Sequence, residues 1–119
     1  MIFTDDLTKS VIVAIKGTSS TRGWVADMMA VEVEFLYGFA HQGILDAALE
    51  VIHHSDEILK RTFEDYPEYQ LVITGHSLGG GAAILAAMTF LSGKTSLDPK
   101  KIKIKVGSKM TSWSFRFCF

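Results

Sequence analysis

The stretch Val72–Ala83 reads VITGHSLGGGAA, and it joins an apolar run, a turn and the start of an apolar segment. The apolar residues from Tyr69 to Ile73 predict a buried strand, and the Ala-, Leu- and Met-rich segment from Leu78 to Leu91 predicts a helix. Residues 75–79 (GHSLG) would form the turn between them. This order is what a nucleophile elbow requires, because glycines two positions either side of the serine remove Cβ atoms that would collide there.

The residue that such an elbow presents for chemistry is Ser77. Its hydroxyl would lie at the amino end of the helix, where the helix dipole favours negative charge. The amide of Leu78 would point at a reacting carbonyl and supply half of an oxyanion hole. The plainer reading of Gly-x-Ser-x-Gly is a tight turn in which the serine caps the helix. The apolar strand before it and Gly80-Gly81 after it favour the elbow.

Nucleotide binding is the other use of a glycine-rich turn after a strand, and the sequence argues against it. The turn lacks the Gly-Lys-Ser/Thr of a phosphate loop, and Ile84 stands where a dinucleotide fingerprint requires glycine. We therefore set the nucleotide-binding class aside.

Composition limits the remaining classes. The chain has 119 residues, of which 48% are hydrophobic, and a net charge of −1, so we expect one domain and no nucleic-acid partner. Cys118 is the only cysteine and His53 and His54 lie beside polar residues, so we expect neither a disulfide nor a metal site. The start of the chain lacks the features of a signal peptide, and no apolar run is long enough to span a bilayer. We expect a cytoplasmic or membrane-associated protein on the cytosolic face.

Outside the elbow, the pattern alternates between strands and helices. We expect strands at Ser10–Ile15, Val31–Tyr37 and Lys101–Val106, and a long amphipathic helix from Ile44 to just before Pro67. Residues 38–43, which include His41, are expected to form a break. This order predicts an α/β fold with a mostly parallel sheet and helices on both of its faces, in which Ser10–Ile15 is a covered interior strand.

Three motifs in this order resemble those of the class 3 lipases, and within them the diacylglycerol lipases, over about residues 8 to 107. Residues 16–27 (KGTSSTRGWVAD) resemble the family's Arg-Gly-Thr-x-Ser-x-x-Asp-Trp-x-Thr-Asp loop. Residues 40–44 (AHQGI) resemble its Ala-His-x-Gly segment, and residues 67–83 are similar to its elbow.

The resemblance implies an α/β-hydrolase fold with Ser77 as the nucleophile and acyl esters of glycerolipids, diacylglycerol or triacylglycerol, as substrates. It also implies that Thr18 holds the oxyanion together with the amide of Leu78. His76 and His41 match positions that support the structure rather than supply the base. The family implies no cofactor, and it implies contact with a membrane or lipid surface only through the substrate.

The sequence departs from the family most clearly after the elbow. α/β-hydrolases place the triad acid and then the histidine after the serine, but all four histidines precede Ser77 and the only later acid is Asp98, in an expected turn. In the loop, Lys16, Gly23 and Ala26 replace the family's Arg, Asp and Thr. We therefore expect residues 1–107 to form part of a lipase domain that lacks the triad acid and base.

Residues 108–119 are expected to be a divergent tail. Two alternatives to a glycerolipid lipase stay open at this point. One is a non-catalytic lipid-binding or regulatory fragment of a lipase, and the other is an esterase for smaller soluble acyl esters. An acid and a histidine in sequence beyond Val106 would separate an enzyme from a non-catalytic fragment.

Overall fold

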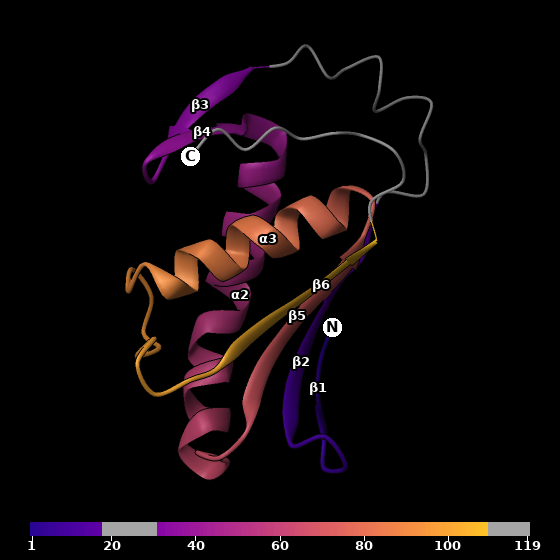
Figure 1. Ribbon diagram of the computed structural model, residues 1–119, viewed down its shortest axis with the longest axis vertical. Coiled ribbons are helices and arrows are strands. Elements are labelled where there is room, and N and C mark those ends of the chain that lie inside the picture. The colour runs from indigo at the N-terminus through magenta and orange to yellow at the C-terminus, as the bar shows by residue number, and fades with distance from the viewer. Residues whose placement is uncertain (18–30, 110–119) are drawn as a thin grey trace.

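The computed structural model describes residues 1–17 and 31–109, and its centre is a four-stranded sheet in the order β1-β2-β5-β6 (Figure 1). The strands are β1 (Ile2–Asp5), β2 (Ser10–Ile15), β5 (Gln70–His76) and β6 (Ile104–Lys109). The pairs β2·β5 and β5·β6 are parallel, whereas β1 runs antiparallel to β2. The expected parallel centre is confirmed, and β1 is an addition that the sequence did not predict.

One face of the sheet carries the core. The alternate residues Val11, Val13, Leu71 and Ile73 are at most 3% exposed, whereas Ile12 and Val72 between them are half-buried. Both described helices, α2 (Gln42–Asp65) and α3 (Leu78–Leu91), lie on the side of the buried residues (Figure 1). We expected helices on both faces and a covered interior strand at β2. In the described residues, the face that carries Ile12 and Val72 has no helix over it.

The helix α2 has the predicted amphipathic pattern. Its buried residues recur at helical spacing and are Ile44, Leu45, Ala48, Ile52, Ser55, Leu59 and Phe63. The helix ends two residues before Pro67, because the residue before a proline is disfavoured in helical conformation. The exposed side of the same helix carries His53 and His54, as expected.

The helix α3 begins and ends where the sequence predicts. It is buried on most of its circumference and packs on β5, β6 and α2. Small residues make this close approach possible, since a Cβ atom on Gly81 would lie 3.1 Å from Cγ2 of Ile44 in α2. The first turn of α3 is thereby fixed against the start of α2.

A β-hairpin replaces the strand and break that we expected between residues 31 and 43. Its strands are β3 (Glu32–Phe35) and β4 (Gly38–His41), which pair antiparallel as a second sheet. The chain reverses at Leu36, whose φ of 52° is unusual for a branched residue and gives no signal in the sequence. The two glutamates of β3 are exposed, as expected.

The strand β6 begins three residues later than expected, because a turn uses the preceding residues. Asp98 accepts hydrogen bonds from the amide of Lys100 to its side chain and from the amide of Lys101 to its carbonyl, both at 3.0 Å. The sheet therefore starts at Ile104, although Lys103 O already accepts a bond of 2.9 Å from Leu71 N.

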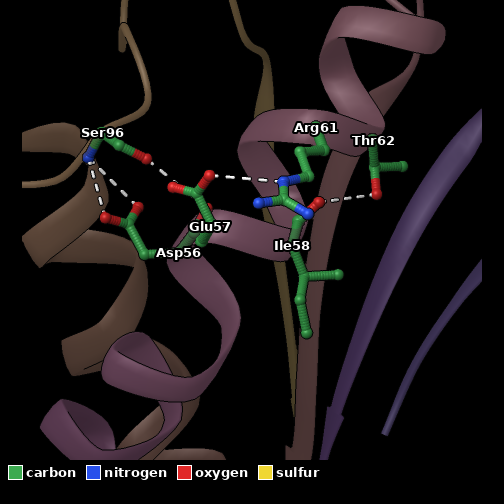
Figure 2. Close-up of polar contacts among 6 residues, drawn as sticks. All are labelled: Asp56, Glu57, Ile58, Arg61, Thr62 and Ser96. Carbon is green, nitrogen blue, oxygen red and sulfur yellow. Dashed lines mark hydrogen bonds and ion pairs between the residues drawn. The ribbon is translucent and has the colours of Figure 1, made fainter.

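The connection between α3 and β6 is tied to the middle of α2. Asp56 accepts hydrogen bonds from the amide of Ser96 with both carboxylate oxygens, at 3.1 and 3.0 Å (Figure 2). Glu57, the next residue of α2, forms an exposed ion pair at 3.3 Å with Arg61 one turn later (Figure 2). Of the helices within the described ranges, none combines the length and apolar character that a membrane span needs.

Candidate active site

Ser77 occupies the single residue between the end of β5 and the start of α3. Its backbone has φ 55° and ψ −123°, a combination that costs a residue with a Cβ atom roughly 1–3 kcal/mol. Lys9 and Leu36 are the other non-glycine residues with positive φ in the described part of the chain, and both lie in turns between antiparallel strands. The strained turn predicted from Gly75-x-Ser77-x-Gly79 is therefore present.

Two glycines make this turn possible because their main chains are in contact. A Cβ atom on Gly75 would lie 2.2 Å from the carbonyl oxygen of Gly79 and 2.8 Å from the amide nitrogen of Gly80. Real Cβ atoms essentially never approach so closely, and a main-chain carbonyl cannot rotate away. The strand and the helix can therefore leave the turn at this angle only with glycine at position 75.

The hydroxyl of Ser77 is not used to cap the helix. Ser77 is the N-cap residue of α3, but its side chain makes no capping hydrogen bond. The main-chain carbonyl of Ser77 accepts the first helical bonds, from Gly80 N at 2.9 Å and Gly81 N at 3.2 Å. The structure thus argues against the plainer reading of the motif as a serine-capped turn, because the half-buried hydroxyl takes no part in the helix cap.

The amides that follow Ser77 form an electropositive helix end. The first amides of a helix have no carbonyl one turn earlier to bind, so those of Leu78 and Gly79 are available to an anion. No acidic residue lies in the first turn of α3. Thr18, which the resemblance places beside the Leu78 amide, lies outside the described residues, but Gly17 before it contacts the carbonyl of His76.

None of the histidines is joined to the serine. Within residues 1–17 and 31–109, no hydrogen bond connects Ser77 Oγ to an imidazole. His76 is exposed, and the ring nitrogens of His41 are buried without a described partner. His54 is on the exposed side of α2, with Nδ1 2.8 Å from Glu50 O.

The only acidic residue after Ser77, Asp98, lies at the opposite end of the sheet from the elbow. Asp98 lies in the turn before β6, and the parallel strands β5 and β6 begin at that end of the sheet, whereas Ser77 follows the carboxyl end of β5. Lys101 pairs with Asp98 at 3.9 Å. Asp98 therefore serves the turn and not the elbow.

The described residues contain no cluster of histidine, cysteine or carboxylate side chains that could hold a metal ion. A groove of about 380 Å³ lies between β2 and α2 and includes Val13, Ile15, Ala47 and Val51 in its lining. None of its lining residues belongs to the elbow. The groove is therefore separate from the candidate site.

Comparison with known proteins gives one consistent family. A family model described as "Lipase (class 3)" matches residues 12–110. A lipase from Rhizomucor miehei is 32% identical over 105 residues, covering 86% of this chain and 29% of that protein. Diacylglycerol lipase-beta of Mus musculus is 40% identical over 97 residues, covering 74% of this chain and 14% of that protein.

Solved structures agree with the sequence matches. The crystal structure of a lipase from Rhizopus microsporus var. chinensis aligns with a TM-score of 0.74 at 30% identity, covering 88% of this chain and 38% of that one. The chain thus spans less than a third of the length of the two relatives named above. These matches confirm the α/β-hydrolase type of fold and the resemblance that three motifs indicated. The chain belongs to the class 3 lipase family.

Proposed function

We propose that this chain supplies the nucleophile and the oxyanion-binding part of a serine lipase that hydrolyses acyl esters of glycerolipids. The observation that carries the proposal is the backbone of Ser77, which has a φ of 55° at the start of α3 and a hydroxyl not used for capping. Strain of this kind persists only where the surrounding structure enforces it, here through the contact between Gly75 and Gly79.

In the proposed reaction, Ser77 Oγ attacks the carbonyl carbon of the ester and its proton passes to a base. The developing oxyanion accepts a hydrogen bond from the amide of Leu78 and a second one from Thr18. The bond from the acyl carbon to the glycerol oxygen then breaks, and the alcohol leaves with the proton. A water molecule then attacks the acyl carbon and gives a proton to the base. The bond from the acyl carbon to Ser77 Oγ breaks, Oγ takes up that proton, and the fatty acid leaves.

The triad acid and base are proposed to lie in the part of the family's domain that this chain does not span. Support comes from the order of the residues, since all four histidines precede Ser77, and from the position of Asp98 in its turn. We keep the boundary at residue 107, between the lipase segment and a divergent tail, as a prediction, although β6 itself continues to Lys109.

Glycerolipids are the proposed substrate class because the relatives are named lipase and diacylglycerol lipase. A lipid substrate implies that the protein works at a membrane or lipid surface, and the cytosolic face stays our expectation because Cys118 is the single cysteine. Sedimentation with diacylglycerol-containing vesicles tests whether the protein binds a lipid surface, and fractionation of cells tests whether it is located on the cytosolic face.

The chemistry is tested by labelling the purified 119-residue chain with a long-chain fluorophosphonate, with and without added imidazole. Imidazole can replace a missing base, so we expect slow labelling that imidazole accelerates and that Ser77→Ala abolishes. A matched control is Ser92→Ala, which removes the hydroxyl at the other end of the same helix and should label like the parent chain.

Two results would overturn the proposal. One is equal labelling of the parent chain and Ser77→Ala. The other is no labelling with imidazole in a sample whose circular dichroism shows a folded α/β protein, which would favour the non-catalytic lipid-binding alternative. Faster labelling by a fluorophosphonate with an ethyl chain than by one with a hexadecyl chain would indicate that the substrates are smaller soluble esters and not glycerolipids.

A further inference from the structure

The end of β2 and the elbow meet through main-chain atoms at two glycines that are far apart in the sequence. A Cβ atom on Gly17 would lie 2.5 Å from His76 O. A Cβ atom on Gly79 would lie 2.6 Å from Ile15 O and 3.0 Å from Gly17 N. Each segment therefore occupies the space that a side chain on the other would need.

This contact joins the two segments that carry the proposed oxyanion donors. Gly17 directly precedes Thr18, and His76 and Gly79 flank Ser77 and Leu78. The strands help to fix the two segments, because β2 and β5 pair in parallel up to Ile15 opposite Gly75. Beyond that pair the ladder ends, so the glycine contact is what sets the remaining separation.

We propose that Gly17 and Gly79 form a spacer that fixes the gap between the end of β2 and the elbow, and that Gly17 is a positioning residue for the amide of Leu78 in the oxyanion site. The inference rests on the proposed function of Ser77. For a Cβ atom on Gly17 to reach the ordinary contact distance of 3.4 Å, the two segments must separate by about 0.9 Å. A misplacement of about 1 Å at a reacting centre costs on the order of 10²-fold in rate.

Other glycines in the described residues provide a contrast. A Cβ atom on Gly107 would meet Oγ1 of Thr74 at 3.2 Å, and one on Gly81 would meet the side chain of Ile44. Side chains can turn aside, whereas the carbonyl of His76 can move only with the main chain of the elbow. Crowding at Gly17 should therefore change the site, and crowding at Gly107 should not.

The test compares Gly17→Ala with Gly107→Ala in the 119-residue chain, using two organophosphorus fluorides that differ only in P=O or P=S. Ser77 Oγ forms a bond to phosphorus, fluoride leaves, and the proton goes to added imidazole. We expect Gly17→Ala to slow the maximal reaction of the P=O probe by about 10²-fold without changing its half-saturating concentration. The loss should be smaller for P=S, because sulfur is the weaker acceptor.

A second measurement does not depend on reactivity. In ¹H–¹⁵N spectra, Gly17→Ala should shift the amide resonances of Leu78 and Gly79 while leaving that of Phe90 unchanged, and Gly107→Ala should shift none of the three. Equal slowing of both probes, or unchanged Leu78 and Gly79 resonances, would overturn the spacer. Loss of the cooperative thermal transition in Gly17→Ala would also overturn it, since the glycine would then support the whole fold.

Failure of the spacer and failure of the proposed function give different results. If the parent chain reacts at Ser77 and Gly17→Ala reacts equally fast, the proposed role of Gly17 is wrong, whereas the proposed role of Ser77 as the nucleophile is supported. If the parent chain does not react even with imidazole, the proposed function is wrong, and the amide resonances still decide whether Gly17 sets the separation.

Discussion

At its carboxyl end, strand β5 is held by main-chain contacts between glycines, whereas at its amino end it is held by hydrogen bonds between side chains. At the amino end, Tyr69 Oη donates to Asp6 Oδ1 at 2.7 Å, and Gln70 Nε2 donates to Ser10 Oγ at 3.0 Å. At the carboxyl end, Gly75 lies against Gly79 and Gly80 with no space for a Cβ atom.

The difference shows how one strand can hold a site rigidly at one end and contribute adjustable stabilising contacts at the other. Hydrogen bonds between side chains adjust to small movements and can be lost one at a time, each at a modest cost in stability. Contacts between main chains adjust little, so they fix Ser77 closely, and a side chain added at one of these glycines must displace the segment that it meets. We expect mutations at the carboxyl end to remove the site, and mutations at the amino end to lower stability while leaving the site unchanged.

The largest effect is expected for Gly75→Ala. The added methyl group would lie 2.2 Å from the carbonyl oxygen of Gly79, and the helix α3 would have to move to avoid it. We expect a loss of roughly 4 kcal/mol or more in the free energy of unfolding, in the upper range of point substitutions, and no labelling of Ser77. Urea unfolding and fluorophosphonate labelling measure both, and a variant that folds and labels like the parent would refute the main-chain account.

A smaller effect is expected in the middle of β5, where neighbouring residues face opposite sides of the sheet. Ile73 is fully buried under the helices, so Ile73→Ala should cost roughly 3 kcal/mol, within the usual range for a buried isoleucine. Val72 is half-buried on the other face, so Val72→Ala should cost about 1 kcal/mol. Equal costs in urea unfolding would mean that the second face is covered as well as the first.

The elbow could be predicted from the sequence because its signals are local. An apolar run, the glycines at 75 and 79, and an apolar helix all lie within about twenty residues, and α3 has the predicted bounds. The hairpin β3–β4 could not be predicted, because its reversal depends on Leu36 in a left-handed conformation. The strand β1 was missed since it is an edge strand of four residues that ends at an acidic residue, Asp5.

The candidate site was predicted in part. The motif predicted the strained turn between the two glycines, which the structure contains, whereas the roles of Ser77 as nucleophile and of Leu78 as oxyanion donor stay predictions. It did not indicate that Gly17 would touch the carbonyl of His76, because that contact joins two strands and depends on their pairing. Thr18 lies outside the described residues, so its role as an oxyanion donor stays a prediction.

The smallest effect is expected at the amino end of β5, for Tyr69→Phe. Loss of the hydrogen bond to Asp6 should lower the melting temperature by a few degrees at neutral pH and leave the labelling rate of Ser77 unchanged. The two ends lie about 20 Å apart along the strand, so the effects of Tyr69→Phe and Gly17→Ala should be additive. Slower labelling in Tyr69→Phe below its melting temperature would show that the two ends are coupled.

The pH dependence of stability gives this comparison a second measure. The hydrogen bond to Asp6, followed by burial and by the negative charges of Asp6 and Glu68, raises the pKa of Tyr69 from 10.0 to about 12. The folded state then holds the phenolic proton more tightly than the unfolded chain, so this stabilisation is complete below pH 10 and is lost as the pH rises towards 12. Urea midpoints between pH 8 and about 11.5 should fall more steeply in the parent chain than in Tyr69→Phe. Tyr37→Phe, at a fully exposed position, should follow the parent curve, and parallel curves for the parent and Tyr69→Phe would contradict the assigned hydrogen bond.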